Sequence, residues 1–354
     1  GAFRARNLYS SGYNYYGGSG IVPTQIPNKD IKWETTANLN TGFDLGLFAN
    51  RISLSADFYY NETTDLLLNR PLPGSTGFTS VSANVGALLN KGMEYSLNTV
   101  NFEGEFNWST NFNISFNQNE ILELYENQPI TDQGRGHNAA IVGQPIGVFY
   151  MYESLGVDPS TGDLVFRDAN GDGQITDADR LVAGDPNPDF TGGLTNSFHF
   201  KGFDLNIFLQ FVYGNDIFNG TRQYAESMKF GTSDNQLATI KDRWQQPGDI
   251  TYVPRVNGQN NLFPHSSHYI EDGSYLRIKE VTLGYNFPGA LLKNTNVIQG
   301  ARVFVKAQNL FTFTNYSGLD PEVNYSGVSA LRAGTDFFTY PNVRTYSAGF
   351  KLQF

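Results

Sequence analysis

Apolar and polar residues alternate along several stretches of this chain. In the clearest stretch, Gly104–Asn117, every second residue from Phe106 to Phe116 is aromatic, Ile or Thr, and the residues between them are Asn or Ser. A period of two is typical of a β-strand, because successive side chains point to opposite faces. One face of this strand is therefore expected to meet water and the other an apolar environment.

Eight other segments alternate in the same way, so the pattern predicts nine strands. The eight are Leu39–Phe48, Arg51–Glu62, Lys91–Asn101, Gly192–Lys201, Phe203–Tyr213, Ser274–Phe287, Ala301–Phe313 and Arg344–Phe354. Their lengths suit a tilted crossing of a bilayer, for which a strand needs about 9–11 residues. The alternation slips at Lys279-Glu280, which predicts a β-bulge.

The links between these segments alternate between short and long. The long links include residues 63–90, 118–191 and 214–273, whereas the links between them are short, and the last strand ends on the short-link side. Outer-membrane barrels have short periplasmic turns and long extracellular loops. The sequence therefore predicts an all-β fold, an antiparallel transmembrane β-barrel, with aromatic residues at both rims.

Composition supports this interpretation and excludes several others. The 354 residues include 28 Phe and 20 Tyr, residue types that gather at lipid–water boundaries. A net charge of −10 excludes nucleic acid as a partner, and the absence of Cys excludes a disulfide framework. A soluble all-β protein also alternates, but it gives no reason for the alternation of link lengths or for aromatic residues at two levels.

Several motifs resemble one family, the SusC/RagA-type TonB-dependent transporters of the outer membrane. They are NKDIKWE (Asn28–Glu34), TTDLLLNRPLPGSTGF (Thr63–Phe78), NVGALLNKGMEYSL (Asn84–Leu97), GQPIGVFY (Gly143–Tyr150), DANGDGQITDADR (Asp168–Arg180), GDPNPDFTGGLTNSF (Gly184–Phe198), KGFDLNIFLQ (Lys201–Gln210), SYLRIKEVTLGYNFP (Ser274–Pro288) and QNLFTFTNYSGLDPE (Gln308–Glu322). Their order and spacing carry the resemblance over residues 28–354.

The resemblance implies a 22-stranded barrel with a plug, located in the outer membrane of a Gram-negative cell. It also implies import of glycans or peptides, energised through TonB, with a SusD-like surface lipoprotein as partner. Residues 1–354 are then expected to be the C-terminal part of the barrel domain, without the plug and the N-terminal strands. No catalytic motif is present, so no enzyme is expected. Two alternatives remain open, a structural or adhesion barrel that does not transport, and a secreted calcium-binding β protein.

The long link 118–191 contains a motif that resembles a twelve-residue calcium loop, at residues 168–179. Oxygen donors fall at positions 1, 3, 5, 7 and 12 of the loop, and Gly173 stands at position 6, where such loops turn sharply. The predicted Ca²⁺ ligands are Asp168, Asn170, Asp172, the carbonyl of Gln174, and Asp179. The role expected for the ion is structural. The alternative is a turn stabilised by Asn and Asp side chains alone.

The polar strand face, rich in Asn, Ser and Tyr, is the expected functional surface, because amides and hydroxyls can bond sugars or peptide backbone. Outer-loop aromatic residues are further candidates for contact with ligand or lipoprotein: Tyr13, Tyr15, Tyr16, Phe218 and Tyr224. His265 and His268 are interpreted as polar residues of a loop surface.

Overall fold

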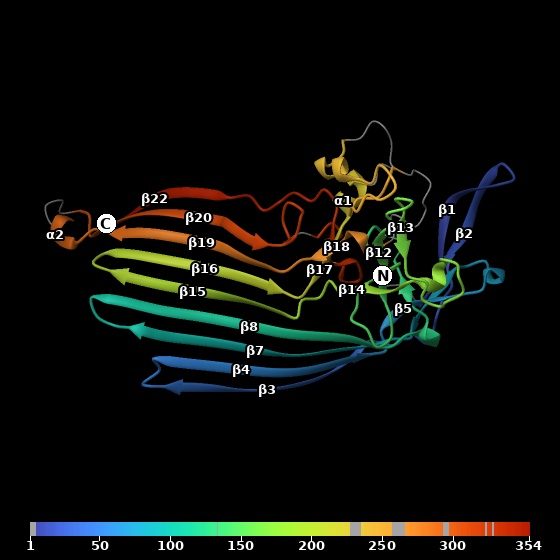
Figure 1. Cartoon of the computed structure of the whole chain (residues 1–354). Helices are drawn as coiled ribbons and strands as arrows, with labels where there is room; N and C mark the ends of the chain where they lie inside the picture. Colours follow the sequence, from blue (N-terminus) through green and yellow to red (C-terminus); the bar gives the residue numbers. More distant parts are fainter. Residues whose placement is uncertain are drawn as a thin grey trace.

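The computed structural model describes residues 5–132, 134–226, 235–256, 266–292, 297–322, 324–327 and 329–354, with every side chain in them except those of Tyr15 and Ala290. Its main feature is a nine-stranded antiparallel sheet in the order β22-β20-β19-β16-β15-β8-β7-β4-β3 (Figure 1). The strands are β3 (Thr35–Leu47), β4 (Ile52–Thr64), β7 (Ala87–Phe102), β8 (Phe106–Glu123), β15 (Phe190–Phe200), β16 (Phe203–Tyr213), β19 (Tyr275–Asn286), β20 (Gly300–Thr314) and β22 (Thr345–Gln353). The nine predicted strands and the antiparallel order are confirmed.

Six of these strands extend beyond the predicted bounds, namely β3, β4, β7, β8, β15 and β20, and the extension is clearest in β7 and β8. The ladder of β7 with β8 continues to the pair Ala87↔Glu123, whereas the alternation ends at Lys91 and Asn117. Backbone pairing between two long strands needs no apolar face once they leave the membrane. The sequence pattern therefore marked the membrane-facing part of each strand and missed the outer extension.

Turn chemistry fixes the register at the short-link end. Phe200 pairs with Phe203 across a two-residue turn in which Lys201 has φ 47° and Gly202 has φ 87°. Positive φ at both central residues is the type I′ geometry that suits twisted hairpins. The predicted bulge is also confirmed, because the register of β19 shifts between Ile278 and Glu280 toward both neighbouring strands.

The long links, and the residues before the first strand of the large sheet, fold into small sheets that the sequence pattern did not predict. The hairpins are β1 (Leu8–Tyr15) with β2 (Gly18–Gln25), β5 (Leu67–Pro71) with β6 (Ser80–Asn84), and β12 (Ser154–Val157) with β13 (Leu164–Phe166). A four-stranded sheet contains β9 (Ile130–Thr131), β10 (Asn138–Ala140), β11 (Val148–Met151) and β14 (Leu181–Gly184). A three-stranded sheet contains β17 (Asp216–Asn219), β18 (Ile270–Asp272) and β21 (Thr335–Asp336).

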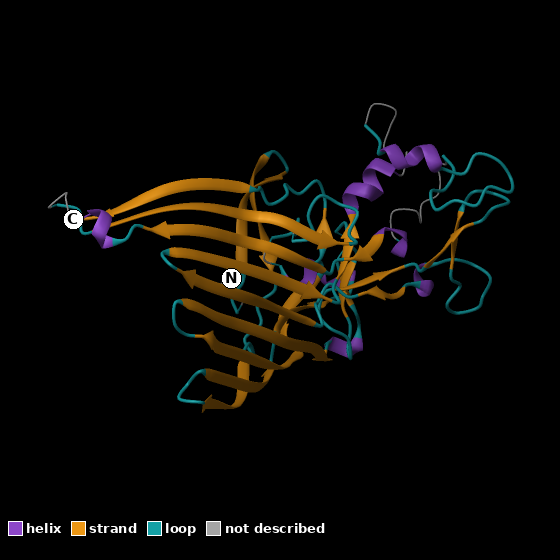
Figure 2. Cartoon of the chain, turned by 60° about the vertical axis from the view of Figure 1, so that its left-hand side comes forward, coloured by secondary structure: helices purple, strands orange, loops and turns teal. Residues whose placement is uncertain are grey.

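Helical segments are short and lie mainly among the loops (Figure 2). The α-helices are α1 (Gly220–Glu226) and α2 (Gly289–Leu292), and the 3₁₀ turns are Gly74–Thr76, Tyr125–Asn127, Asp177–Asp179, Ala238–Asp242, Ser267–Tyr269 and Ala330–Arg332. In the part of the chain that the structure describes, no helix has the length and apolar character needed to cross a membrane.

The loops share a core of their own at the end of the sheet away from the short hairpin turns (Figure 1). Phe149, Met151, Leu164, Phe218 and Tyr269 are buried together there. These residues come from links that are far apart in sequence, so their packing joins the loops into one body. The loops therefore pack together as one folded unit at this end of the sheet, which we call the loop cap, and they are not separate flexible segments.

Candidate functional site

The polar face of the sheet carries a network of side-chain hydrogen bonds between neighbouring strands. Asn111 donates to Asn98 at 2.5 Å, and Ser197 donates to Asn206 at 2.6 Å. Tyr59 crosses the neighbouring strand to donate to Asn117 at 2.7 Å. These groups are partly exposed, so the face can exchange its bonds with a polar ligand.

Two ion pairs join strands on the same face. Lys306 Nζ lies 2.6 Å from Glu280, and Arg302 Nε donates to Asp204 at 3.1 Å. The second pair crosses over Gly284, where an added Cβ would lie 2.5 Å from Arg302 Nη2. A side chain at this position would therefore displace the ends of Arg302 and Asp204 from their present positions.

A third ionic cluster fixes the loop 315–344 to the polar face. Arg277 on β19 is only 1% exposed, and its Nη1 lies 2.6 Å from Glu322 of the loop. Its Nη2 pairs with Asp320, and its Nε donates to Thr312 at 2.9 Å. Lys279 lies 2.8 Å from Glu322. The motif Leu319–Glu322 thus supplies the carboxylates that hold this loop against the inner side of the sheet.

A largely buried cation, Arg222, joins α1 to the other loops. Arg222 donates to Glu226 at 3.0 Å and to the Tyr252 hydroxyl at 3.0 Å, and it also bonds Glu271 and the carbonyl of His268. The His268 ring stacks on Tyr252 at 4.3 Å. Burial, together with the nearby guanidinium of Arg222, lowers the pKa of His268 to about 3.

His268 is therefore a neutral residue of the loop core. It is 3% exposed, so the interpretation as a surface residue was wrong. His265 lies outside the described residues. A long-range pairing of loops buries His268, and neither the composition nor the spacing of the loop indicated it.

The predicted outer-loop aromatic residues fall into different environments. Tyr13 and Tyr16 are exposed on the β1–β2 hairpin, and the side chain of Tyr15 lies outside the described residues. Phe218 is fully buried in the loop core, so it is not a contact residue for ligand. Tyr224 packs edge-on against Phe337 and Phe338.

The calcium-like loop is held closed by its own backbone. Asp168 accepts from the N–H groups of Gly171 and Gly173, both at 2.7 Å. Asp179 is fully buried and accepts from Thr176 at 2.7 Å and Ala169 at 2.9 Å. Hydrogen bonds from these N–H groups lower the pKa of the Asp179 carboxyl, and the bond from Thr176 has the largest effect.

The donor types of this loop suit Ca²⁺, but their arrangement is not that of a formed site. Asn170 Nδ2 donates to Asp172 at 3.0 Å, so these two side chains bond each other. Gln174 offers its carbonyl at the position the motif requires. Among the described residues, no group of three or more His, Asp or Glu side chains converges to hold a metal ion. The five predicted ligands therefore stay a prediction.

Two belts of aromatic rings lie on the apolar face. Near the loops, ring contacts connect Phe58, Tyr95, Phe116, Phe190 and Tyr213 at centroid distances of 5.0–6.5 Å. Near the short turns, the rings include Phe102, Phe106, Trp108, Phe198, Phe203 and Tyr285. Such belts mark the two surfaces of a bilayer.

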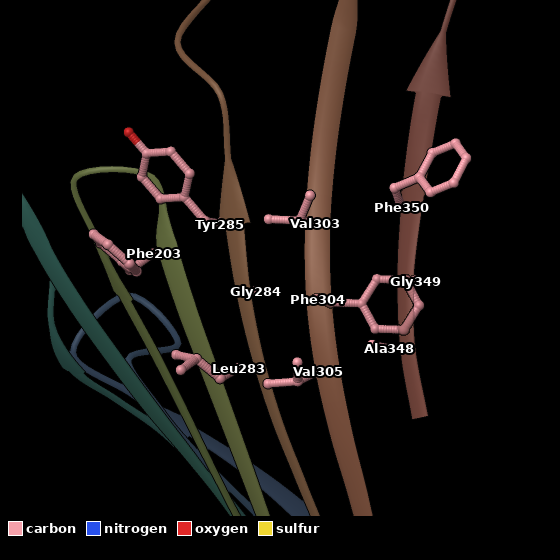
Figure 3. Close-up of a pocket in the computed structure, with 10 residues that line it drawn as sticks. All are labelled: Phe203, Leu283, Gly284, Tyr285, Val303, Phe304, Val305, Ala348, Gly349 and Phe350. Carbon is pink, nitrogen blue, oxygen red and sulfur yellow. The ribbon is translucent and has the colours of Figure 1, made fainter. Parts of the chain in front are cut away.

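The apolar face is grooved near the short-turn end of the sheet (Figure 3). Phe203 and Tyr285 stand on one side of the groove and Phe350 on the other, with Val303 between them and Ala348 on the strand of Phe350. The cavity has a volume of about 510 Å³. Its apolar walls suit hydrocarbon rather than a polar nutrient, so the polar face is the candidate site for transport.

Comparison with known proteins agrees with a sheet that has one polar and one apolar face. Residues 2–310 match the family model described as TonB dependent receptor-like, beta-barrel. The chain is 38% identical to TonB-dependent receptor P3 of Formosa agariphila, over 95% of this chain and 36% of the relative. It is 30% identical to TonB-dependent receptor SusC of Bacteroides thetaiotaomicron, over 92% of this chain and 32% of the relative.

Among solved structures, the chain is similar to the RagAB peptide transporter. The TM-score is 0.84 and the identity 29%, over 99% of this chain and 38% of that chain. The chain therefore spans about a third of the length of the curated relatives that it matches.

Proposed function

Because the chain belongs to the TonB dependent receptor-like β-barrel family, we propose that it forms part of the wall of an outer-membrane importer for oligomeric nutrients. The observation that carries the proposal is the two-faced sheet. One face offers hydroxyls, amides and ion pairs, and the other offers apolar side chains with an aromatic belt near each end. A wall of this kind separates a wet passage from lipid.

The proposed cargo is a glycan or a peptide, and the proposed partners are a SusD-like lipoprotein and TonB. Similarity to SusC and to the RagAB peptide transporter supports this class of import. The chemistry of the polar face agrees, since Asn and Ser side chains can donate hydrogen bonds to, and accept them from, both sugar hydroxyls and peptide backbone. The loop 315–344 is fixed to the same face through Arg277, so on this proposal it is a further candidate for contact with the ligand.

We test this with the whole receptor in its native outer membrane. Gentle extraction and affinity purification, followed by mass spectrometry, should recover a surface lipoprotein and a bound oligosaccharide or oligopeptide. Deletion of the receptor gene should abolish uptake of the same labelled oligomer. Recovery of the receptor without lipoprotein or ligand, with uptake unchanged in the deletion strain, would contradict import and favour a structural barrel.

We further propose that the loop at residues 168–179 binds Ca²⁺ in a structural role. The carboxylates of Asp168 and Asp179 already draw the loop together. Each Asp168 oxygen accepts one N–H and keeps a second lone pair for a metal, whereas each Asp179 oxygen accepts two bonds and would have to release its longer one, from Asn170 or from the Thr176 hydroxyl. Binding would require Asn170 and Asp172 to exchange their mutual bond for the ion.

A further inference from the structure

A group of polar side chains interrupts the apolar face close to the short-turn end. It consists of Thr99 and Asn101 on β7, Thr110 on β8 and Asn196 on β15, and we refer to it as the polar cluster. Thr99 pairs with Thr110, and Thr110 pairs with Asn196, so these side chains share one row across three strands. The flanking residues of the row are Ile52 and Ile207.

The next row toward the loops is apolar, with Leu97, Phe112 and Leu194 in register. The polar cluster therefore lies on the face turned toward lipid. Polar groups at that position are costly unless they are hydrogen-bonded. Four such residues in one place require partners, and most of those partners are within the cluster.

The hydrogen bonds of the cluster run in one direction. Thr99 donates to Asn101 at 2.9 Å, Asn101 donates to Thr110 at 2.9 Å, and Thr110 donates to Asn196 Oδ1 at 2.8 Å. Trp108 Nε1 also donates to Asn196 Oδ1, at 2.9 Å. An indole N–H can only donate, so it fixes which end of the Asn196 amide is oxygen.

The chain of bonds ends at the amide nitrogen of Asn196. Within the described residues, Asn196 Nδ2 has no hydrogen-bond acceptor, although it lies on the lipid side. A donor in this position requires an acceptor from outside the protein. The ester carbonyl of a membrane lipid is such an acceptor, and it lies at the boundary between headgroup and hydrocarbon.

The residues around Asn196 could contact the other parts of a phospholipid, which are its glycerol region and its phosphate. On the short-turn side, the Trp108 ring is stacked between Phe102 at 5.9 Å and Phe198 at 5.7 Å. Lys201, at the turn itself, has a largely exposed side chain whose ammonium lies 5.2 Å from the Phe200 ring. Phe200 is four positions along the strand from Asn196, which is about 10 Å of depth for a tilted strand.

We propose that this region binds one phospholipid of the periplasmic leaflet. The Lys201 ammonium contacts the phosphate. Lys201 lies 3.9 Å from Glu105, and this weak ion pair is replaced by the contact with the phosphate when the lipid binds. Asn196 Nδ2 donates to an ester carbonyl, and the acyl chains lie along Leu194 and Ile207. The inference rests on the apolar face of the family's barrel meeting lipid, and it does not depend on what the receptor imports.

The test is native mass spectrometry of the intact receptor released from membranes in mild detergent. Asn196→Leu removes the amide and keeps the size of the side chain, and Lys201→Gln removes the cation at an exposed turn where folding is not at risk. The matched control is Asn111→Leu, which removes an amide from the polar face of the adjacent strand.

We expect the fraction of receptor carrying one phospholipid to fall about threefold to tenfold in each of the two test variants, because each variant removes one hydrogen bond or one charge contact to the lipid. Asn111→Leu should leave that fraction unchanged. Added diacylglycerol, which has the esters but no phosphate, should fail to displace the phospholipid. Equal retention in all variants, displacement by diacylglycerol, or loss of a receptor dimer in place of lipid in Asn196→Leu would each overturn the proposal.

Discussion

Removing the guanidinium of Arg277 should release the loop 315–344 and leave the sheet intact. Arg277 is 1% exposed and Asp320 is 4% exposed, so Arg277→Met leaves a buried carboxylate without its cation. Removing one member of a buried ion pair costs about 3–5 kcal/mol. Glu322 keeps Lys279 at 2.8 Å, so we take the lower end, about 3 kcal/mol.

This loss should lower the free energy of local opening of the loop by the same amount. At about 1.4 kcal/mol per factor of ten, the open population rises on the order of 100-fold. Hydrogen–deuterium exchange read by mass spectrometry measures this directly on peptides that cover residues 316–342 of the intact receptor. The protected amides of these peptides should exchange faster by that factor, while peptides from β7 and β8 should not change.

Two further variants make the measurement specific. Arg302→Met breaks the pair with Asp204, whose side chains are 31% and 20% exposed, so it should leave exchange of the loop unchanged. Neutralising Asp320 and Glu322 to Asn and Gln in the Arg277→Met background should restore part of the protection, because no buried charge is then left alone. Exchange of the loop within threefold of wild type in Arg277→Met would refute the reasoning.

Three other predictions follow from the structure. Gly284→Ala places a Cβ 2.5 Å from a guanidinium nitrogen, so it should displace the partly exposed pair of Arg302 and Asp204 and destabilise the barrel by about 1 kcal/mol or less. The measurement is the unfolding temperature, read from the change in mobility of the receptor on a gel, and an unchanged unfolding temperature would contradict the close approach. Ca²⁺ at 100 times its dissociation constant should stabilise the outer loops by about 2.7 kcal/mol against proteolysis, and Asp168→Ala should abolish the effect; equal protection in both proteins would exclude the site. Burial lowers the pKa of His268 from about 6.5 in the unfolded chain to about 3 in the folded one, so the stability that its neutral form contributes is complete above pH 6.5 and is lost as pH falls toward 3. Between pH 7 and 4.5 the free energy of unfolding of the loop cap, measured with urea, should therefore fall by about 2–3 kcal/mol more in wild type than in His268→Gln. Parallel pH profiles in the two proteins would contradict the burial.

Alternation was a sufficient signal for the sheet, because each strand has lipid on one side and water on the other. The slip of parity at Lys279-Glu280 was visible for the same reason, since a bulge moves every later side chain to the opposite face. Local turn chemistry at Gly202 also needed no knowledge of distant residues. These features depend on near neighbours in sequence or on a uniform environment.

The loop cap could not be predicted, because its order comes from contacts between distant links. In the sequence, Phe218 and Tyr269 are aromatic residues with no apolar pattern around them, and only the packing of several loops buries them together. The clamp at Arg277 joins a strand to carboxylates at Asp320 and Glu322, a pairing that spacing alone does not indicate. Asn196 is a polar residue at an apolar-face position of β15, and only the hydrogen bonds show that its amide oxygen accepts within the cluster while its amide nitrogen does not donate there.

The most direct test of the central claim is cysteine scanning of β8 in the intact receptor, because this chain has no Cys of its own. Single cysteines at residues 111–116 are treated in living cells with a bulky water-soluble maleimide, and labelling and uptake of the imported oligomer are measured together. We expect labelling at Asn111, Asn113 and Ser115, with loss of uptake, and neither labelling nor inhibition at Phe112, Ile114 and Phe116. Labelling without a period of two, or uptake that persists when the polar face is modified, would contradict the claim that this sheet is the wall of a transport passage.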